Sequence, residues 1–205
     1  MSIKNVKTSV KTIARSLESS RDDRVYLIKH TRDAISLCSQ SIIAVHGQDL
    51  PSAKKKVIEA KCLIKKFRPK AVGILAKYLS MPEQEYTEAM AIIAIAEKKQ
   101  IPSHKSLTVS GDSYVLGLLD CIGEMKRMML DMTRRGNLKD AEIVFGTMED
   151  LFAQLYPFAA LDKVVKEARR KLDVNRMILE SSRTVITEEI RRAEFVKALK
   201  EKSLK

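Results

Sequence analysis

Apolar residues recur at helical spacing through most of this chain, and no strand-like alternation bounded by turn residues persists. The clearest stripe lies in residues 111–129, where apolar side chains occupy every third or fourth position. Its members are Val115, Leu118, Ile122, Met125 and Met129. Seven glycines and five prolines separate stretches rich in Lys, Glu, Ala, Leu, Ile and Met, a composition typical of helices. The pattern predicts an all-α fold in which residues 1–205 form one domain.

The longest predicted helix runs from about residue 3 to residue 46, where Gly47 ends it. A helix of this length exceeds the common range, so we expect it to pack against other helices or other subunits along its length. Further helices are expected at about 52–70, 72–79, 80–96, 111–134, 138–156 and 159–179, with a separate last helix ending at residue 205.

Two acids lie one helical turn apart on the side opposite the apolar stripe, Asp120 and Glu124. Gly117 and Gly123 flank them. Because a glycine inside a helix costs about 1 kcal/mol relative to alanine, we expect another group to approach this part of the helix closely. The alternative interpretation is a pair of surface acids beside glycines that ease helix packing.

A second pair of acids, Glu85 and Glu88, lies near the start of the helix predicted at 80–96. Their face continues as Ala89 and Ile92, which are expected to be buried, so the two acids should point toward the core or a cavity in it. The alternative is that they interact with the positive end of the helix dipole, as acids in a first turn often do.

The net charge of +12 favours a polyanionic partner, with nucleic acid ahead of an anionic membrane surface. The alternative is a lysine-rich surface that binds nothing. Residues 54–70 hold eight basic side chains against one acid, Glu59, and this imbalance favours contacts with phosphates. The eight are Lys54, Lys55, Lys56, Lys61, Lys65, Lys66, Arg68 and Lys70. Arg127, one turn beyond the second acid of its helix, is a further candidate.

Several other classes of protein are disfavoured. The longest unbroken apolar run, residues 89–96, is too short to span a membrane, and residues 1–7 lack the apolar core of a signal peptide. Three cysteines without CxxC spacing indicate reduced core residues of a cytoplasmic protein. His30 and His46 have no acid at ligand spacing, so we interpret them as ordinary helix-surface or helix-end residues. Glycine-rich phosphate loops, HExxH and a Ser/His/Asp set do not occur.

Four stretches together resemble the translin family and, within it, the branch of translin-associated factor X. They are residues 25–35 (VYLIKHTRDAI), 84–89 (QEYTEA), 112–127 (DSYVLGLLDCIGEMKR) and 168–173 (ARRKLD). The second and third are similar to the QEYxEA and DYLLGxxDLTGELMR patterns of that branch. The departures are Cys121 and Ile122 in place of Leu-Thr, and Met125 and Lys126 in place of Leu-Met.

The resemblance implies a seven-helix α-fold that assembles as a homo-oligomer, roughly an octamer, around a hollow interior. It implies binding of single-stranded RNA or single-stranded DNA, with no membrane partner. The factor X branch adds an endoribonuclease site in which four carboxylates hold Mg²⁺ or Mn²⁺. Those positions are matched here by Glu85, Glu88, Asp120 and Glu124, which the resemblance therefore makes both metal-binding and catalytic.

Two other functions remain open from the sequence. The first is a translin-like shell that binds single-stranded nucleic acid without cleaving it, in which the four acids are structural. The second is a helical bundle for metal storage or redox chemistry, which is disfavoured because no Glu-x-x-His pair occurs among these acids.

Overall fold

The computed structural model describes residues 3–203, and every regular element within them is helical. The α-helices are α1 (Lys4–His46), α2 (Leu50–Phe67), α3 (Ser80–Ala96), α4 (His104–Leu107), α5 (Gly111–Arg134), α6 (Leu138–Leu155) and α7 (Ala168–Ser203), and two 3₁₀ segments span Gly73–Leu79 and Tyr156–Leu161. The predicted all-α fold with seven helices and a long first helix is confirmed. No helix within the described residues has the length and apolar character needed to cross a membrane.

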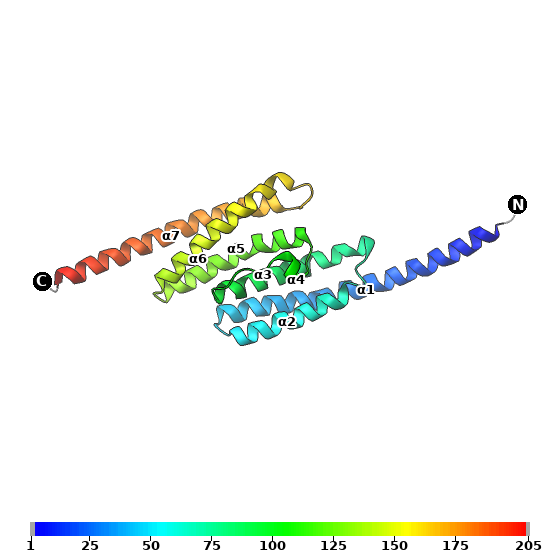
Figure 1. Cartoon of the computed structure of the whole chain (residues 1–205), viewed down its shortest axis with the longest axis horizontal. Coiled ribbons are helices and arrows are strands. Elements are labelled where there is room, and N and C mark those ends of the chain that lie inside the picture. Colours follow the sequence, from blue (N-terminus) through cyan, green and yellow to red (C-terminus); the bar gives the residue numbers. More distant parts are fainter. Residues whose placement is uncertain (1–2, 204–205) are drawn as a thin grey trace.

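Helices α3 and α5 pack together in the middle of an elongated bundle (Figure 1). On one side α1 contacts α3 and also packs along α2, whereas on the other side α6 and α7 both contact α5. The apolar stripe predicted on α5 is buried from Val115 to Met129. Its burial holds α5 at the centre of the bundle, where side chains from α3 and α7 reach its polar face.

The C-terminal region differs from the sequence prediction, because one continuous helix replaces the two that were expected. Residues 156–161 form a 3₁₀ segment that contains Pro157, and α7 begins only at Ala168. The Asp162 carboxylate accepts a hydrogen bond from the backbone N–H of Arg169, 3.0 Å away, in the first turn of α7. From there to residue 203 the chain has no glycine or proline to interrupt the helix.

The contact between α3 and α5 depends on Gly117. A Cβ atom built at this position would lie 2.5 Å from the backbone oxygen of Gln84 and 2.8 Å from the Cβ of Thr87. The expected close approach is therefore confirmed at Gly117. It is wrong at Gly123, where a Cβ atom would meet nothing within 4 Å. Only the first of the two glycines is required by the packing of α3 on α5.

We expect Gly117→Ala and Gly123→Ala to change stability in opposite directions. The first forces α3 and α5 apart and should lower the free energy of unfolding by about 1–3 kcal/mol. The second should raise it by up to about 1 kcal/mol, because alanine favours a helix interior and has room there. Urea unfolding followed by circular dichroism measures both. Equal changes in the two variants would contradict the assigned role of Gly117.

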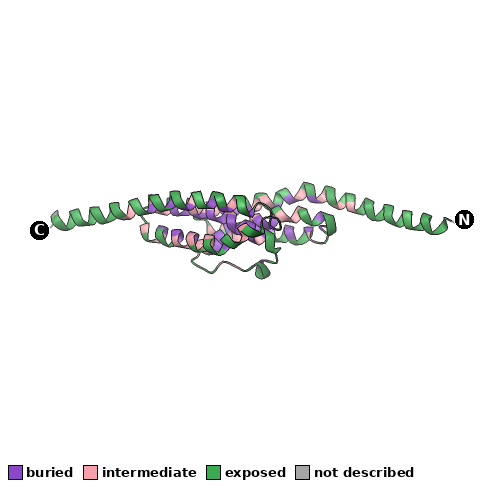
Figure 2. Ribbon diagram, turned by 90° about the horizontal axis from the view of Figure 1, so that it is seen from above, coloured by how far each residue is buried: buried purple, intermediate pink, exposed green. Residues whose placement is uncertain are grey.

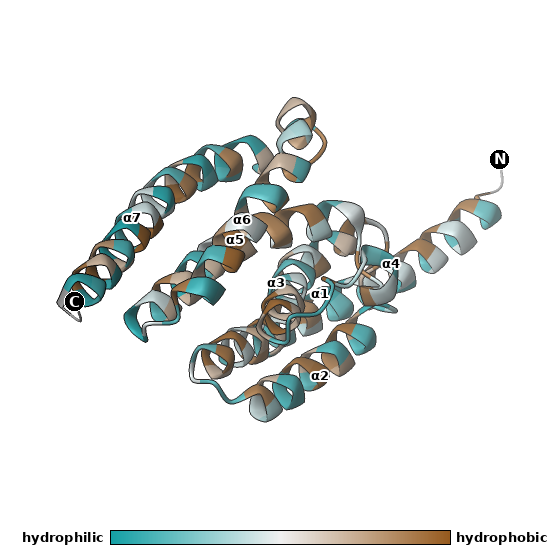
Figure 3. Ribbon diagram, turned by 60° about the vertical axis from the view of Figure 1, so that its left-hand side comes forward, coloured by the Kyte–Doolittle hydropathy of each residue, from teal (hydrophilic) through white to brown (hydrophobic). Residues whose placement is uncertain are grey.

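Both ends of the chain project from the bundle in opposite directions (Figures 1 and 2). The projecting end of α1 carries apolar side chains that alternate at spacings of three and four, each 56–65% exposed, namely Ile3, Val6, Val10, Ile13 and Leu17. Figure 3 shows these apolar positions recurring along that end. A seam with this spacing is typical of helices that pair in coiled coils. The end of α7 likewise exposes Phe195, Val196 and Leu199. The exposed seam favours association of several copies of the chain.

We expect the protein to be a homo-oligomer larger than a dimer, assembled in part through this seam. The double variant Val10→Asp, Ile13→Asp places charges in the seam and should lower the mass measured by light scattering. Thr8→Asp, Thr12→Asp adds the same charge on the same helix outside the seam, so its mass should equal that of the wild type. A monomeric wild type at micromolar concentration, or an unchanged mass in the seam variant, would contradict this prediction.

Candidate carboxylate site

The four acids singled out from the sequence gather where α3 faces α5. Glu85 and Glu88 come from α3, and Asp120 and Glu124 come from α5. They lie close enough to influence one another, because Asp120 and Glu124 contribute to raising the pKa of both glutamates of α3. The two pairs therefore lie on facing helices within electrostatic range of one another, and their convergence on one metal ion stays a prediction.

Glu88 is the most deeply buried of the four, at 9% exposure. Burial, followed by the charges of Glu85, Asp120 and Glu124, raises its pKa to about 8, and the nearby Lys171 ammonium offsets only part of this. Burial and the other acids also raise the pKa of Glu85. The site therefore carries more negative charge than its own cations balance, and a carboxyl group that stays protonated at neutral pH relieves part of the repulsion.

Glu124 is paired with His46, the last residue of α1. The His46 Nε2 atom lies 2.6 Å from the Glu124 Oε2 atom, and its Nδ1 atom lies 3.8 Å from the Asp131 Oδ2 atom. The hydrogen bond from His46 is the main reason that the pKa of Glu124 falls below its ordinary value. The interpretation of His46 as an ordinary helix-end residue is thus wrong, since its side chain is only 5% exposed and belongs to the site.

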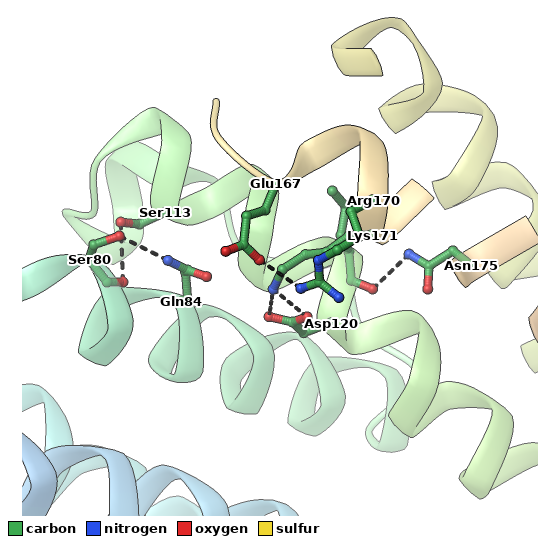
Figure 4. Close-up of polar contacts among 9 residues, drawn as sticks. Ser80, Gln84, Ser113, Asp120, Glu167, Arg170, Lys171 and Asn175 are labelled. Carbon is green, nitrogen blue, oxygen red and sulfur yellow. Dashed lines mark hydrogen bonds and ion pairs between the residues drawn. The ribbon is translucent and has the colours of Figure 1, made fainter. Parts of the chain in front are cut away.

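Asp120 is paired with Lys171, from the first turn of α7 (Figure 4). The Lys171 ammonium contacts both carboxylate oxygens of Asp120. The start of α7 is partly buried: Ala168 is fully buried and the Lys171 side chain is only 15% exposed. Nearby, the Asn175 side chain donates a hydrogen bond to the Leu119 carbonyl oxygen, 2.9 Å away, and fixes α7 against α5.

A cavity of about 670 Å³ lies between α3, α5 and the start of α7, and Lys171 is part of its lining. Ser80 and Gln84 line its α3 side, and the basic residues Lys166, Arg170 and Lys171 on the other side are accompanied by the acids Asp112 and Glu167. A smaller cavity of about 160 Å³ is lined by Asp120 itself and shares Arg170 and Lys171 with the larger one. Asp120 therefore borders a space that contains two basic side chains, which can attract a phosphate-containing ligand.

The oxygen-only chemistry of the four side chains suits a hard cation such as Mg²⁺ or Mn²⁺. Burial and the charges of the neighbouring acids together raise the pKa of Glu88, and a bound cation would relieve the part that comes from charge repulsion. Within residues 3–203, however, no group of three or more His, Cys, Asp or Glu side chains is placed so that it could hold a metal ion. Asp120 is engaged by Lys171 and Glu124 by His46. The four carboxylates are thus of a chemical type that binds a hard cation, but two of them already form ion pairs with basic side chains of the protein.

The basic residues predicted to contact nucleic acid fall into two groups. Four are engaged within the chain: Lys54 with Glu97 at 2.5 Å, Lys56 with Gln40 at 2.7 Å, Arg68 with Glu83 at 2.9 Å and Lys70 with Asp23 at 2.7 Å. The other four are exposed and form no ion pair with another described residue, namely Lys55, Lys61, Lys65 and Lys66. Arg127 lies 3.8 Å from Glu124 and is exposed at the edge of the carboxylate site. About half of the basic side chains at residues 54–70 therefore keep their charge available for a phosphate.

Comparison with known proteins agrees with this fold. The chain matches the translin family over residues 2–185. It belongs to the translin family. An uncharacterized protein of Methanocaldococcus jannaschii is 36% identical over 166 residues, which cover 78% of this chain and 72% of that protein.

Solved structures of two other proteins share the translin fold of this chain. AfC3PO in complex with duplex RNA superposes with a TM-score of 0.80 at 25% identity, covering 90% of this chain and 97% of that one. AfC3PO without RNA gives a TM-score of 0.81 at 25% identity, with 90% and 98% coverage. Apo-NeC3PO gives 0.78 at 21% identity, with 88% and 96% coverage. The helical bundle of this chain is thus the translin fold over nearly its whole length.

We expect Glu88→Gln to make the metal-free translin-family protein less sensitive to rising pH. The pKa of Glu88 is about 8 in the folded state against an ordinary value of 4.5, so the unfolded chain ionises first. Stability therefore falls as pH rises between these two values. An amide at this position cannot ionise, and thermal unfolding in EDTA should show a smaller loss between about pH 5 and pH 8. Glu59→Gln, which alters an exposed acid of α2, should follow the wild type. Parallel profiles for all three proteins would contradict the assignment.

Proposed function

We propose that this translin-family protein is a metal-dependent endoribonuclease that binds and cleaves single-stranded RNA inside a homo-oligomeric shell. The main support is the placement of Glu85, Glu88, Asp120 and Glu124 on two facing helices within electrostatic range of one another, with Asp120 lining a cavity that also contains Arg170 and Lys171. These acids also occupy the four positions that the resemblance to the factor X branch assigns to its metal site. The AfC3PO complex with duplex RNA supports a nucleic-acid partner for this fold.

The four carboxylates would hold Mg²⁺ or Mn²⁺, and the bound cation supplies an activated water and stabilises negative charge on the phosphate. His46 keeps Glu124 ionised and fixes its orientation through the 2.6 Å hydrogen bond. Burial of Glu88 excludes bulk water from the inner side of the site. Lys166 and Arg170 line the larger cavity together with Lys171, and we expect them to attract the RNA backbone.

Phosphates outside the cleavage site would be bound by the exposed lysines of α2, which are Lys55, Lys61, Lys65 and Lys66. The remaining basic residues of that segment are held in contacts within the chain, so they position α2 more than they bind RNA. Few aromatic side chains accompany these lysines. Contacts with the backbone therefore dominate, and we expect weak preference for base sequence.

A second function is a translin-like shell that binds nucleic acid without cleaving it. The pairing of Asp120 with Lys171 and of Glu124 with His46 favours it, because ion pairs of this kind also occur as purely structural contacts. The two functions differ in what the loss of one carboxylate does to cleavage.

Glu85→Gln is the most informative test, because this acid has no hydrogen bond or ion pair with another described residue, whereas Asp120 and Glu124 do. Cleavage of labelled single-stranded RNA in Mg²⁺ should fall by more than about 100-fold, since losing even an outer partner of a metal ligand costs about 10- to 100-fold. Folding and RNA binding should remain close to those of the wild type, and Glu59→Gln should cleave normally.

Full cleavage by Glu85→Gln, in preparations free of contaminating ribonuclease, would rule out the carboxylate site. Binding without cleavage by the wild type would favour the shell. Duplex RNA and single-stranded DNA, tested in parallel, establish which nucleic acid the protein prefers.

A further inference from the structure

Lys171 occupies a place in the carboxylate site that a metal cation would also need. Its ammonium contacts both oxygens of Asp120 (Figure 4). An aspartate offers a cation these same two oxygens. The Lys171 side chain is only 15% exposed, so its ammonium is better shielded from water than the basic groups in the exposed ion pairs of this chain.

The charge of Lys171 reaches beyond Asp120. Burial and the neighbouring acids raise the pKa values of Glu85 and Glu88, and the Lys171 ammonium opposes both shifts. One positive charge thus partly neutralises three carboxyl groups that lie on two helices. This is the role that a divalent cation would perform more completely.

The fold delivers Lys171 to this position and holds its backbone there. Ala168 and Leu172, which flank it on α7, are buried, and Asn175 one turn later is hydrogen-bonded to the carbonyl oxygen of Leu119, the residue before Asp120. The adjacent Arg170 is turned to Glu167, with 2.6 Å between the guanidinium Nη2 atom and the Glu167 Oε2 atom. The two neighbouring cations therefore have different ion-pair partners, and within the described residues Lys171 is the one that contacts Asp120 directly.

The Lys171 side chain also has room to leave. It lines both the small cavity that contains Asp120 and the adjoining cavity of about 670 Å³. A lysine side chain is long and flexible, so its ammonium can move several ångströms while the helix stays fixed. Movement into this cavity would place a positive charge against the wall where an RNA phosphate would bind.

We propose that Lys171 is a displaceable internal cation: it neutralises Asp120 in the metal-free protein and is released into the adjoining cavity when a divalent cation binds. The inference rests on the proposed metal site. It implies that metal binding has to overcome the Lys171–Asp120 ion pair, and that metal binding exposes an ammonium to the substrate channel. Asp120 of the metal-free site is then neutralised by Lys171 until a divalent cation binds.

The test is the affinity for Mn²⁺, measured by isothermal titration calorimetry on the full-length protein without RNA. Lys171→Gln should bind Mn²⁺ about fivefold more tightly than the wild type, the equivalent of about 1 kcal/mol for one partly exposed ion pair. Arg169→Gln removes the same charge from an exposed position of α7 two residues away and leaves Asp120 paired, so its affinity should stay close to that of the wild type. Equal affinities for all three proteins would overturn the proposal while leaving the metal site intact.

A second measurement uses the wild type and does not depend on the folding of a variant. Acetylation of lysines, quantified by mass spectrometry, should modify Lys171 slowly in EDTA and several times faster in saturating Mn²⁺. Lys166, an exposed lysine on the same cavity, should react equally in both conditions. An unchanged rate at Lys171 with bound Mn²⁺ would overturn the displacement. Absence of any Mn²⁺ binding to the wild type and both variants would instead remove the metal site, and this proposal with it.

Discussion

The close approach of α3 and α5 at Gly117 is the contact on which the rest of the site depends. The Gln84 carbonyl lies where any other residue at position 117 would place its Cβ atom. Glu85 follows Gln84 directly, and Asp120 lies one turn after Gly117. The missing side chain therefore allows two acidic helix faces to meet inside the bundle. Burial of the apolar stripe of α5 supplies the stabilisation that holds these charges together.

Bringing four carboxyl groups together has an electrostatic cost that the fold meets only in part. Lys171 offsets charge at Asp120 and His46 does so at Glu124, each from a helix outside the α3–α5 pair. Glu88 remains with a pKa raised to about 8, first because it is buried and then because the other acids repel its charge. A cation that binds among these carboxyl groups would lower their mutual repulsion. The same residual negative charge that opposes folding thus favours metal binding, which is a common relation between stability and function at active sites.

Features set by local pattern were predictable from the sequence, whereas those set by long-range packing were not. The spacing from Val115 to Met129 predicted the buried face of α5, and the position of Asp120 and Glu124 opposite it followed directly. No local pattern could show that Glu124 would meet His46, 78 residues away, or that Asp120 would meet Lys171, 51 residues away.

Composition likewise overstated the free charge of α2. Lys54 and Arg68 find acidic partners on α3 or just beyond its end, and only the folded chain reveals them. The two glycines of α5 show the same limit. Gly117 and Gly123 both flank the acids of α5 in the sequence, but a Cβ atom at Gly123 would meet nothing within 4 Å.

Whether the gathered carboxylates form a metal-dependent nuclease site can be measured on the wild-type protein itself. Purified protein is incubated with end-labelled single-stranded RNA in EDTA, and then with Mg²⁺ or Mn²⁺ restored. We expect intact RNA in EDTA and internal cleavage fragments once either cation is present. RNA that is bound but stays intact under both conditions would rule out a nuclease site.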